Sequence, residues 1–169
     1  CSMSNWKKKK DLFTSVQNMT LVTPSEWLAG LVKQSFLGKY PVKVIRNGVD
    51  TTVFKLTYGN FRNANHLENQ KIVLGVASVW DKRKGLDDFI KLSEMLDSTY
   101  SVVLVGISEK QKRRLPEGII GITRTNNTTQ LAEIYTAADV FVNPTYEDNY
   151  PTVNLEAQAC GTPVITYNT

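Results

Sequence analysis

The chain has 169 residues, 41 % of them hydrophobic, which suits one globular domain with a buried core. Its formal net charge of +4 equals the contribution of the four lysines at positions 7–10, so nucleic-acid binding is not predicted. No apolar run approaches the roughly 20 residues that span a bilayer, and no secretory signal opens the chain. We therefore expect a cytoplasmic protein. Peripheral contact of the lysine run with the inner face of a membrane is one alternative, and a solvated lysine face is the other.

The first part of the chain predicts two short strands and a helix. Residues 1–10 are polar and basic and are expected to be frayed, and a strand is expected over 19–22. Thr23-Pro-Ser-Glu26 has the spacing of a capping box and predicts the start of a helix that ends at Gly38. A second strand is expected over 42–45.

Residues 58–70 turn polar and are expected to form a linker or surface loop, with the lone His66 as a surface residue. Beyond them, apolar strands alternate with amphipathic helices. Strands are predicted over 72–77, 101–105, 119–123, 140–142 and 164–167, and helices over 86–96, 109–114, 129–138 and from 152 to the glycine at 161. This alternation predicts an α/β fold, a Rossmann-like parallel sheet with helices on both faces.

Polar and basic residues follow the first four of these strands. They are residues 78–84, Gly106, Arg124 and residues 143–150. The carboxyl ends of parallel strands share one edge of a sheet, where ligands bind in such folds. The sequence therefore predicts a binding site at that edge.

Two acids, Asp148 and Glu156, flank the start of the last predicted helix, whose free N–H groups attract anions. Glu156 lies in a run otherwise suited to packing against a sheet, where an unpartnered charge would cost several kcal/mol. A partner for Glu156 is one interpretation. The alternative is that Glu156 only complements the helix dipole, for about 0.3 to 1 kcal/mol.

The stretch Trp80-Asp-Lys-Arg-Lys-Gly85 places three cations in a loop that opens a helix. A diphosphate leaving group needs its growing charge neutralised, and the sequence has no Asp-x-Asp pair for a metal. The two cysteines, Cys1 and Cys160, lack the spacing of a metal site. Lys and Arg are therefore the predicted phosphate ligands, and a charged surface loop is the alternative.

The stretch from Asp148 to Val164 resembles the retaining nucleotide-sugar glycosyltransferases of the two-Rossmann-domain (GT-B) type, family 4, also called group 1. Their signature is a Glu, seven residues, and then a Glu-Ala-Met-Ala-Cys-Gly-x-Pro-Val-like run. Here Asp148 takes the first acid position, Glu156 the second, and Ala-Gln-Ala-Cys-Gly-Thr-Pro-Val follows. The chain departs from the family at Asn149-Tyr-Pro151, usually Gly-Phe-Gly, and at Ser78, near which the family has an arginine.

The resemblance implies a role for each residue. Lys84, aided by Arg83, would contact the donor phosphates. Glu156 would bind the ribose hydroxyls, and Asp148 would bind the transferred sugar. The predicted catalytic residues are Lys84, Asp148 and Glu156. The further predicted donor-binding residues are Ser78, Arg83, Gly106, Arg124, Glu147, Asn149, Tyr150, Thr152 and Val153.

By the same resemblance, residues 1–57 are the remnant of an acceptor domain with its crossover, residues 58–70 a linker, and residues 71–169 a donor domain without its C-terminal end. The expected reaction moves a sugar from a nucleotide diphosphate sugar to a glycan or lipid-linked acceptor, with retention, no metal and no cofactor. The acceptor would bind through a preceding N-terminal domain, and the isolated piece is expected to be inactive.

Two alternatives remain from the sequence. A nucleotide-sugar epimerase shares the fold, and a non-catalytic nucleotide- or polyanion-binding module would use the same cations. A hydride-transferring Rossmann enzyme is disfavoured because Gly-x-Gly-x-x-Gly follows none of the strands.

Overall fold

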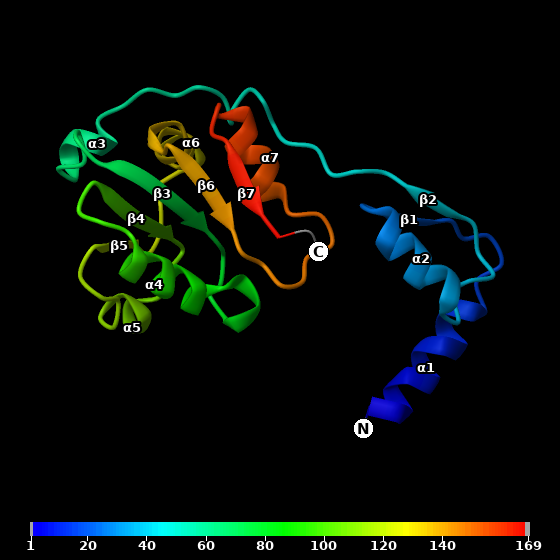
Figure 1. The fold of residues 1–169 in the computed structure, drawn as a ribbon. Coiled ribbons are helices and arrows are strands. Elements are labelled where there is room, and N and C mark those ends of the chain that lie inside the picture. The colour runs from blue at the N-terminus through cyan, green and yellow to red at the C-terminus, as the bar shows by residue number, and fades with distance from the viewer. Residues whose placement is uncertain (1, 168–169) are drawn as a thin grey trace. The chain divides into compact units, whose positions relative to one another are not determined.

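The computed structural model describes residues 2–167, and the chain divides into two compact units, Cys1–Asn47 and Gly48–Thr169. Each unit is described by itself (Figure 1). None of the described helices is long and apolar enough to cross a membrane.

The N-terminal unit pairs two short parallel strands with two helices. Its elements are α1 (Ser2–Thr14), β1 (Leu21–Thr23), α2 (Glu26–Gln34) and β2 (Val42–Val44). The expectation of a frayed start was wrong, because α1 is a helix, in keeping with the good helix propensity of lysine. Helix α1 buries no residue, but the Tyr40 hydroxyl donates to the carbonyls of Phe13 and Val16, each at 2.7 Å.

Helix α2 was predicted, but its cap and its end differ from the prediction. The Ser25 hydroxyl accepts from the Leu28 N–H at 3.2 Å, whereas the Thr23 hydroxyl donates to the Ser25 carbonyl. Ser25 is therefore the N-cap. The helix ends before Gly38, because Ser35 takes an extended conformation after Gln34.

The C-terminal unit is built on a five-stranded, wholly parallel sheet in the order β5-β4-β3-β6-β7. The strands are β3 (Lys71–Val76), β4 (Tyr100–Val105), β5 (Ile119–Ile122), β6 (Val140–Asn143) and β7 (Val164–Thr166). The helices are α3 (Phe61–Ala64), α4 (Leu86–Met95), α5 (Glu109–Lys112), α6 (Thr128–Ala137) and α7 (Thr152–Ala159). The predicted Rossmann-like α/β fold is confirmed.

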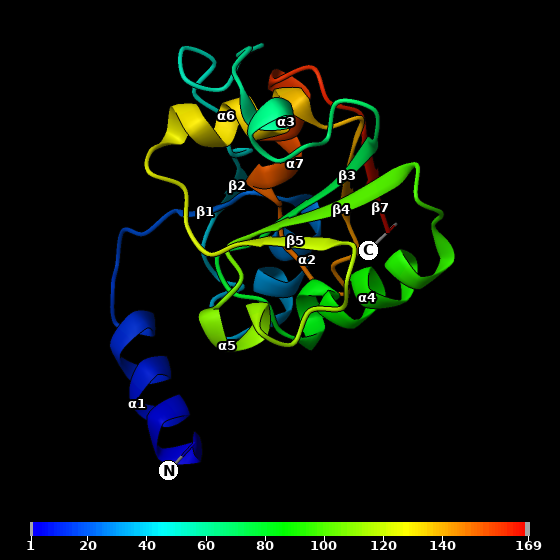
Figure 2. The same cartoon turned by 90° about the vertical axis from the view of Figure 1, so that its left-hand side faces the viewer.

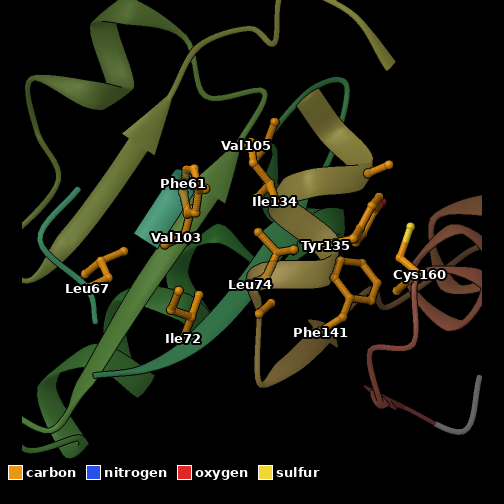
Figure 3. Packing of buried hydrophobic residues seen from close by; sticks show 13 residues of the cluster. Phe61, Leu67, Ile72, Leu74, Val103, Val105, Ile134, Tyr135, Phe141 and Cys160 are labelled. Carbon is orange, nitrogen blue, oxygen red and sulfur yellow. The ribbon is translucent and has the colours of Figure 1, made fainter. Parts of the chain in front are cut away.

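Helices cover both faces of this sheet, with α3, α6 and α7 on one side and α4 and α5 on the other (Figure 2). Two apolar clusters fill the interfaces. The first joins strand residues such as Leu74 to Ile134 and Tyr135 of α6 (Figure 3), and the second joins Leu104 to Phe89 of α4. The alternating side chains of the strands therefore supply both layers.

Residues 58–70, expected as a linker or loop, contain α3 and two core residues, Phe61 and Leu67. Arg62 anchors this segment: its guanidinium donates to the Ala137 carbonyl at 3.0 Å and to the Asp139 carboxylate at 2.7 Å. These contacts attach the segment to the start of β6. The segment is thus part of the C-terminal unit.

The order of the strands fixes where a ligand can bind. β4 and β5 lie on one side of β3, and β6 and β7 lie on the other, so the direction of chain winding reverses between β3 and β6. In parallel sheets, ligands bind at such a reversal, beyond the carboxyl ends of the strands. The loops after β3 and β6 carry Lys84 and Asp148.

Trp80, in the loop after β3, is a structural residue. It is 5 % exposed, its indole N–H donates to the Val105 carbonyl at 2.9 Å, and its ring meets Phe89 edge to face at 5.4 Å. Trp80 therefore ties the loop to β4 and to α4.

Candidate functional site

The loops that follow β3 and β6 touch each other at Arg83. The Arg83 carbonyl accepts from the Tyr146 N–H at 2.9 Å and from the Thr145 hydroxyl at 3.2 Å. In return, the Arg83 guanidinium donates to the Glu147 carbonyl at 2.9 Å. Thr145 is only 1 % exposed. The two loops therefore form one surface at the carboxyl edge of the sheet.

Lys84 and Asp148 form an ion pair across these loops, with the Lys84 ammonium 2.6 Å from the carboxylate Oδ2. Their side chains are 18 % and 21 % exposed. Lys84 is placed by the 3-10 turn η1 (Lys82–Lys84), in which the Asp81 carboxylate accepts from the Lys84 N–H at 3.0 Å. Gly85 then takes a left-handed φ of 73° and starts α4.

Glu156 lies in α7 and has a partner. Its Oε2 accepts from the hydroxyl of Tyr135, on α6, at 3.0 Å. Burial raises the pKa of Glu156, and the hydroxyls of Tyr135 and Thr152 oppose that rise. The sequence left open whether Glu156 has a hydrogen-bond partner or only complements the helix dipole, and the structure shows a partner.

The N-terminus of α7 faces the same edge of the sheet. Pro151 is its N-cap, and no described side chain caps this end. The N–H groups of Thr152 and Val153 are the first of the helix and have no carbonyl partner within it. Because Pro151 precedes the helix, its missing N–H removes no donor from the first turn.

The remaining predicted donor-binding residues are spread along this edge. Ser78 follows β3, Arg124 follows β5, and Asn149 lies in the loop before α7; all three are exposed, whereas Tyr150 is partly buried. The structure brings Lys84 to Asp148 and Arg83 to Glu147. It describes no direct contact of Glu156 with Lys84 or Asp148.

Gly106, after β4, is required by the fold itself. Its φ is 87°, its N–H donates to the Ile122 carbonyl at 2.8 Å, and a Cβ at this position would overlap the Ala77 carbonyl oxygen.

Two hollows lie beside these loops. One, of about 590 Å³, is lined by Lys82, Arg83, Lys91, Tyr146 and Glu147, together with two aspartates of α4. The other, of about 290 Å³, lies between α4 and β7 and is mostly apolar. Lys84 and Asp148 line neither hollow. A ligand that contacts both residues must replace their ion pair with its own charged or hydrogen-bonding groups.

The sequence interpretation missed two residues that hold the site. Tyr135 was predicted only as part of the apolar face of its helix, and Thr145 was not singled out. A tyrosine on a fully buried face is a usable signal, since a buried hydroxyl needs a partner.

The sequence model of the family described as "Glycosyl transferases group 1" matches residues 59–169, which carry this whole site. The chain belongs to that family. The processive diacylglycerol alpha-glucosyltransferase of Acholeplasma laidlawii is 27 % identical over 157 residues, which cover 86 % of this chain and 47 % of that protein. The chain thus spans less than half the length of this relative.

Solved structures of similar proteins give the same fold for this group 1 glycosyltransferase chain. Sucrose-phosphate synthase from Thermosynechococcus elongatus matches with a TM-score of 0.73 and 22 % identity, over 87 % of this chain and 40 % of that chain. HepE from Anabaena, solved with UDP and glucose, matches with a TM-score of 0.69 and 16 % identity, over 88 % and 44 %. The C-terminal unit therefore has the Rossmann-like architecture of the C-terminal domain of a GT-B protein.

Proposed function

We propose that the C-terminal unit binds a nucleotide diphosphate sugar and forms the donor half of an enzyme that transfers the sugar to a glycan or glycolipid. The observation that carries this proposal is the Lys84–Asp148 contact, which brings a cation and a sugar-binding acid together where the winding of the sheet reverses. HepE, of the same fold, binds UDP and glucose in its crystal. Polysaccharide or glycolipid synthesis is the biological setting that fits this chemistry.

Each group has a part in donor binding. Lys84, with Arg83 beside it, would neutralise the charge that develops on the diphosphate. The N–H groups of Thr152 and Val153 add helix-dipole stabilisation for the same oxygens. Glu156 would accept hydrogen bonds from the ribose hydroxyls, and Asp148 from hydroxyls of the transferred sugar.

The Lys84–Asp148 ion pair supports this division of roles, because each side chain neutralises the charge of the other. A nucleotide sugar offers a diphosphate to Lys84 and hydroxyl donors to Asp148, so both charges gain new partners when it binds. The donor therefore replaces the pair without leaving a partly buried charge uncompensated.

In the proposed reaction, an acceptor hydroxyl forms a bond to the anomeric carbon while the bond from that carbon to the diphosphate oxygen breaks. The hydroxyl proton passes to the leaving phosphate, and the configuration is retained. Fixed cations compensate the leaving-group charge, so the proposed mechanism uses no metal.

Peripheral contact with a membrane is part of the proposal, because a diacylglycerol-linked acceptor would lie there. Helix α1 is exposed and carries the four lysines at positions 7–10, with Met3 and Trp6 also exposed. A cationic helix gains about 1 kcal/mol per lysine near an anionic surface. Sedimentation with phosphatidylglycerol vesicles, but not with phosphatidylcholine vesicles, is expected, and it should be lost when the four lysines are changed to Gln.

Ligand screening tests the proposed function. We expect one or more of UDP, GDP, ADP, CDP and their glucose derivatives to raise the melting temperature of the chain. Glu156→Gln should remove most of that rise, whereas Glu94→Gln, an exposed acid near the end of α4, should keep it. Absence of stabilisation by every nucleotide overturns the proposal. Binding that depends on salt but not on the base would indicate a polyanion-binding module instead.

A further inference from the structure

We propose that Tyr135 is a positioning residue for donor binding: its hydroxyl holds the Glu156 carboxylate in place for the ribose of the nucleotide. This inference rests on the proposed function. The observation behind it is the 3.0 Å hydrogen bond from the Tyr135 hydroxyl to Glu156 Oε2, between α6 and α7. Tyr135 itself touches no ligand in this scheme and acts only through Glu156.

Tyr135 is held rigidly by the core. It is 0 % exposed, and its ring packs edge to face against Phe141 at 5.6 Å and Phe54 at 6.2 Å. Its backbone carbonyl accepts from the buried hydroxyl of Thr162. Figure 3 shows the ring beside Phe141, with Cys160 of the α7 end nearby. A side chain fixed on several sides directs its hydroxyl to one place.

The hydrogen bond still leaves Glu156 able to bind a ligand. A carboxylate has about four acceptor positions, and the hydroxyls of Tyr135 and Thr152 occupy two of them. Two adjacent ribose hydroxyls need the other two. A flexible glutamate would lose rotamer freedom on binding, and the bond to Tyr135 removes that freedom in advance.

The same bond favours the charged form of the acid. The groups that face Glu156 are the hydroxyls of Tyr135 and Thr152 and the thiol of Cys160. Burial raises the pKa of Glu156, and hydrogen bonds from the two hydroxyls lower it again. Burial, followed by the nearby Glu156 charge, also raises the pKa of Tyr135 far above its usual range, so Tyr135 remains a donor at every physiological pH.

The test compares Tyr135→Phe with the wild type by titration calorimetry, using the nucleoside diphosphate that binds tightest and its 2′-deoxy counterpart. We expect Tyr135→Phe to weaken binding of the ribonucleotide about tenfold, the effect of one charge-assisted hydrogen bond. The loss for the 2′-deoxy nucleotide should be several-fold smaller, because it offers Glu156 one hydroxyl fewer. The acid limb of binding should also move to higher pH in the variant.

Two controls separate positioning from packing. Tyr40→Phe removes a hydroxyl that makes two hydrogen bonds in the other unit and should leave nucleotide binding unchanged. In a Glu156→Gln background, Tyr135→Phe should have no further effect on binding.

An equal loss for both nucleotides, or no loss at all, overturns the positioning role and leaves the proposed function standing. A Tyr135→Phe variant that is too unstable to bind either nucleotide also overturns the positioning role, because the Tyr135 hydroxyl would then be needed for the stability of the core. A wild-type chain that binds no nucleotide overturns the proposed function, and this inference with it.

Discussion

Lys84 and Asp148 are 64 residues apart in the sequence, yet their side chains meet at 2.6 Å. The pair joins the two loops at the point where the winding of the sheet reverses.

Asp148→Asn should separate phosphate binding from sugar binding. The change frees Lys84 from its ion pair, so affinity for the bare nucleoside diphosphate should be unchanged or higher. The additional affinity conferred by the sugar should fall, because an amide accepts hydroxyl hydrogen bonds less strongly than a carboxylate. Calorimetry with the nucleoside diphosphate and with its sugar derivative measures the two affinities. An equal loss of affinity for the two ligands would contradict the role of Asp148 in sugar binding.

Lys84→Ala should weaken binding of every nucleoside diphosphate. One charge-assisted contact is worth about 1.5 to 3 kcal/mol, which corresponds to roughly a 10- to 150-fold rise in the dissociation constant. Lys33→Ala, at an exposed lysine of α2 in the N-terminal unit, is the control and should change affinity little. Similar losses in the two variants would point to general electrostatic attraction.

Glu156→Gln should stabilise the fold at neutral pH while it impairs binding. The pKa of Glu156 is raised by burial, so its favourable contribution is complete below the usual glutamate value of 4.5 and is lost as pH rises through the folded-state value. The variant should therefore be more stable than the wild type near pH 7, and the two should converge in acid. Urea unfolding of the variant and the wild type across this pH range is the measurement. A variant that is less stable than the wild type at neutral pH would argue against the burial of Glu156.

Gly106→Ala should destabilise the fold more than Gly118→Ala does. Both glycines have left-handed φ values, 87° and 91°, so both substitutions incur about 1–2 kcal/mol of backbone strain. Only at Gly106 would the new Cβ meet backbone, the Ala77 carbonyl, whereas nothing lies within 4 Å at Gly118. The difference in unfolding free energy between the two variants measures that contact. Equal losses of unfolding free energy in the two variants would show that β3 and β4 can move apart at Gly106 without a cost in stability.

Asp139→Asn should lower stability at neutral pH. Asp139 accepts from the Ile72 N–H at 2.9 Å and pairs with Arg62 and Lys71. Burial would raise the pKa of Asp139, but these hydrogen bonds outweigh burial and lower it, so its contribution is present above pH 3.8 and is lost as pH falls through the lower folded-state value.

The expected loss for Asp139→Asn is about 1.5 kcal/mol, the low end for charged hydrogen bonds because the side chain is 30 % exposed. Lys71→Ala, at a side chain 66 % exposed, should change stability by less than about 1 kcal/mol. Thermal unfolding at pH 7 and pH 3 would contradict the prediction if Asp139→Asn matched the wild type at both.

The regular part of the fold could be predicted from sequence because its signals are local. Strands and helices after residue 71 follow from apolar periodicity, and their ends agree with the structure to within one or two residues. Helix α3 was missed, since its core residue Phe61 lies in a polar stretch with no period to reveal it. The start of α2 was misplaced because Thr23 and Ser25 are both acceptable caps, and only tertiary position decides between them.

The site could be predicted by residue type but not by contact. The family motif identifies Asp148 and Glu156, and the lysine loop identifies Lys84. No local rule pairs Lys84 with Asp148, because the pairing depends on the order of strands that are distant in sequence. For the same reason, the sequence indicates that Glu156 needs a partner but does not select Tyr135 from the neighbouring helix.

Of the three tryptophans in the chain, only Trp80 lies in the unit that carries Lys84, whereas Trp6 and Trp27 belong to the N-terminal unit. Because Trp80 is buried at the root of the loop after β3, its intrinsic fluorescence should respond when that loop rearranges. A chain with Phe at positions 6 and 27 would therefore emit from one indole, a built-in optical reporter that needs no dye and no labelled ligand.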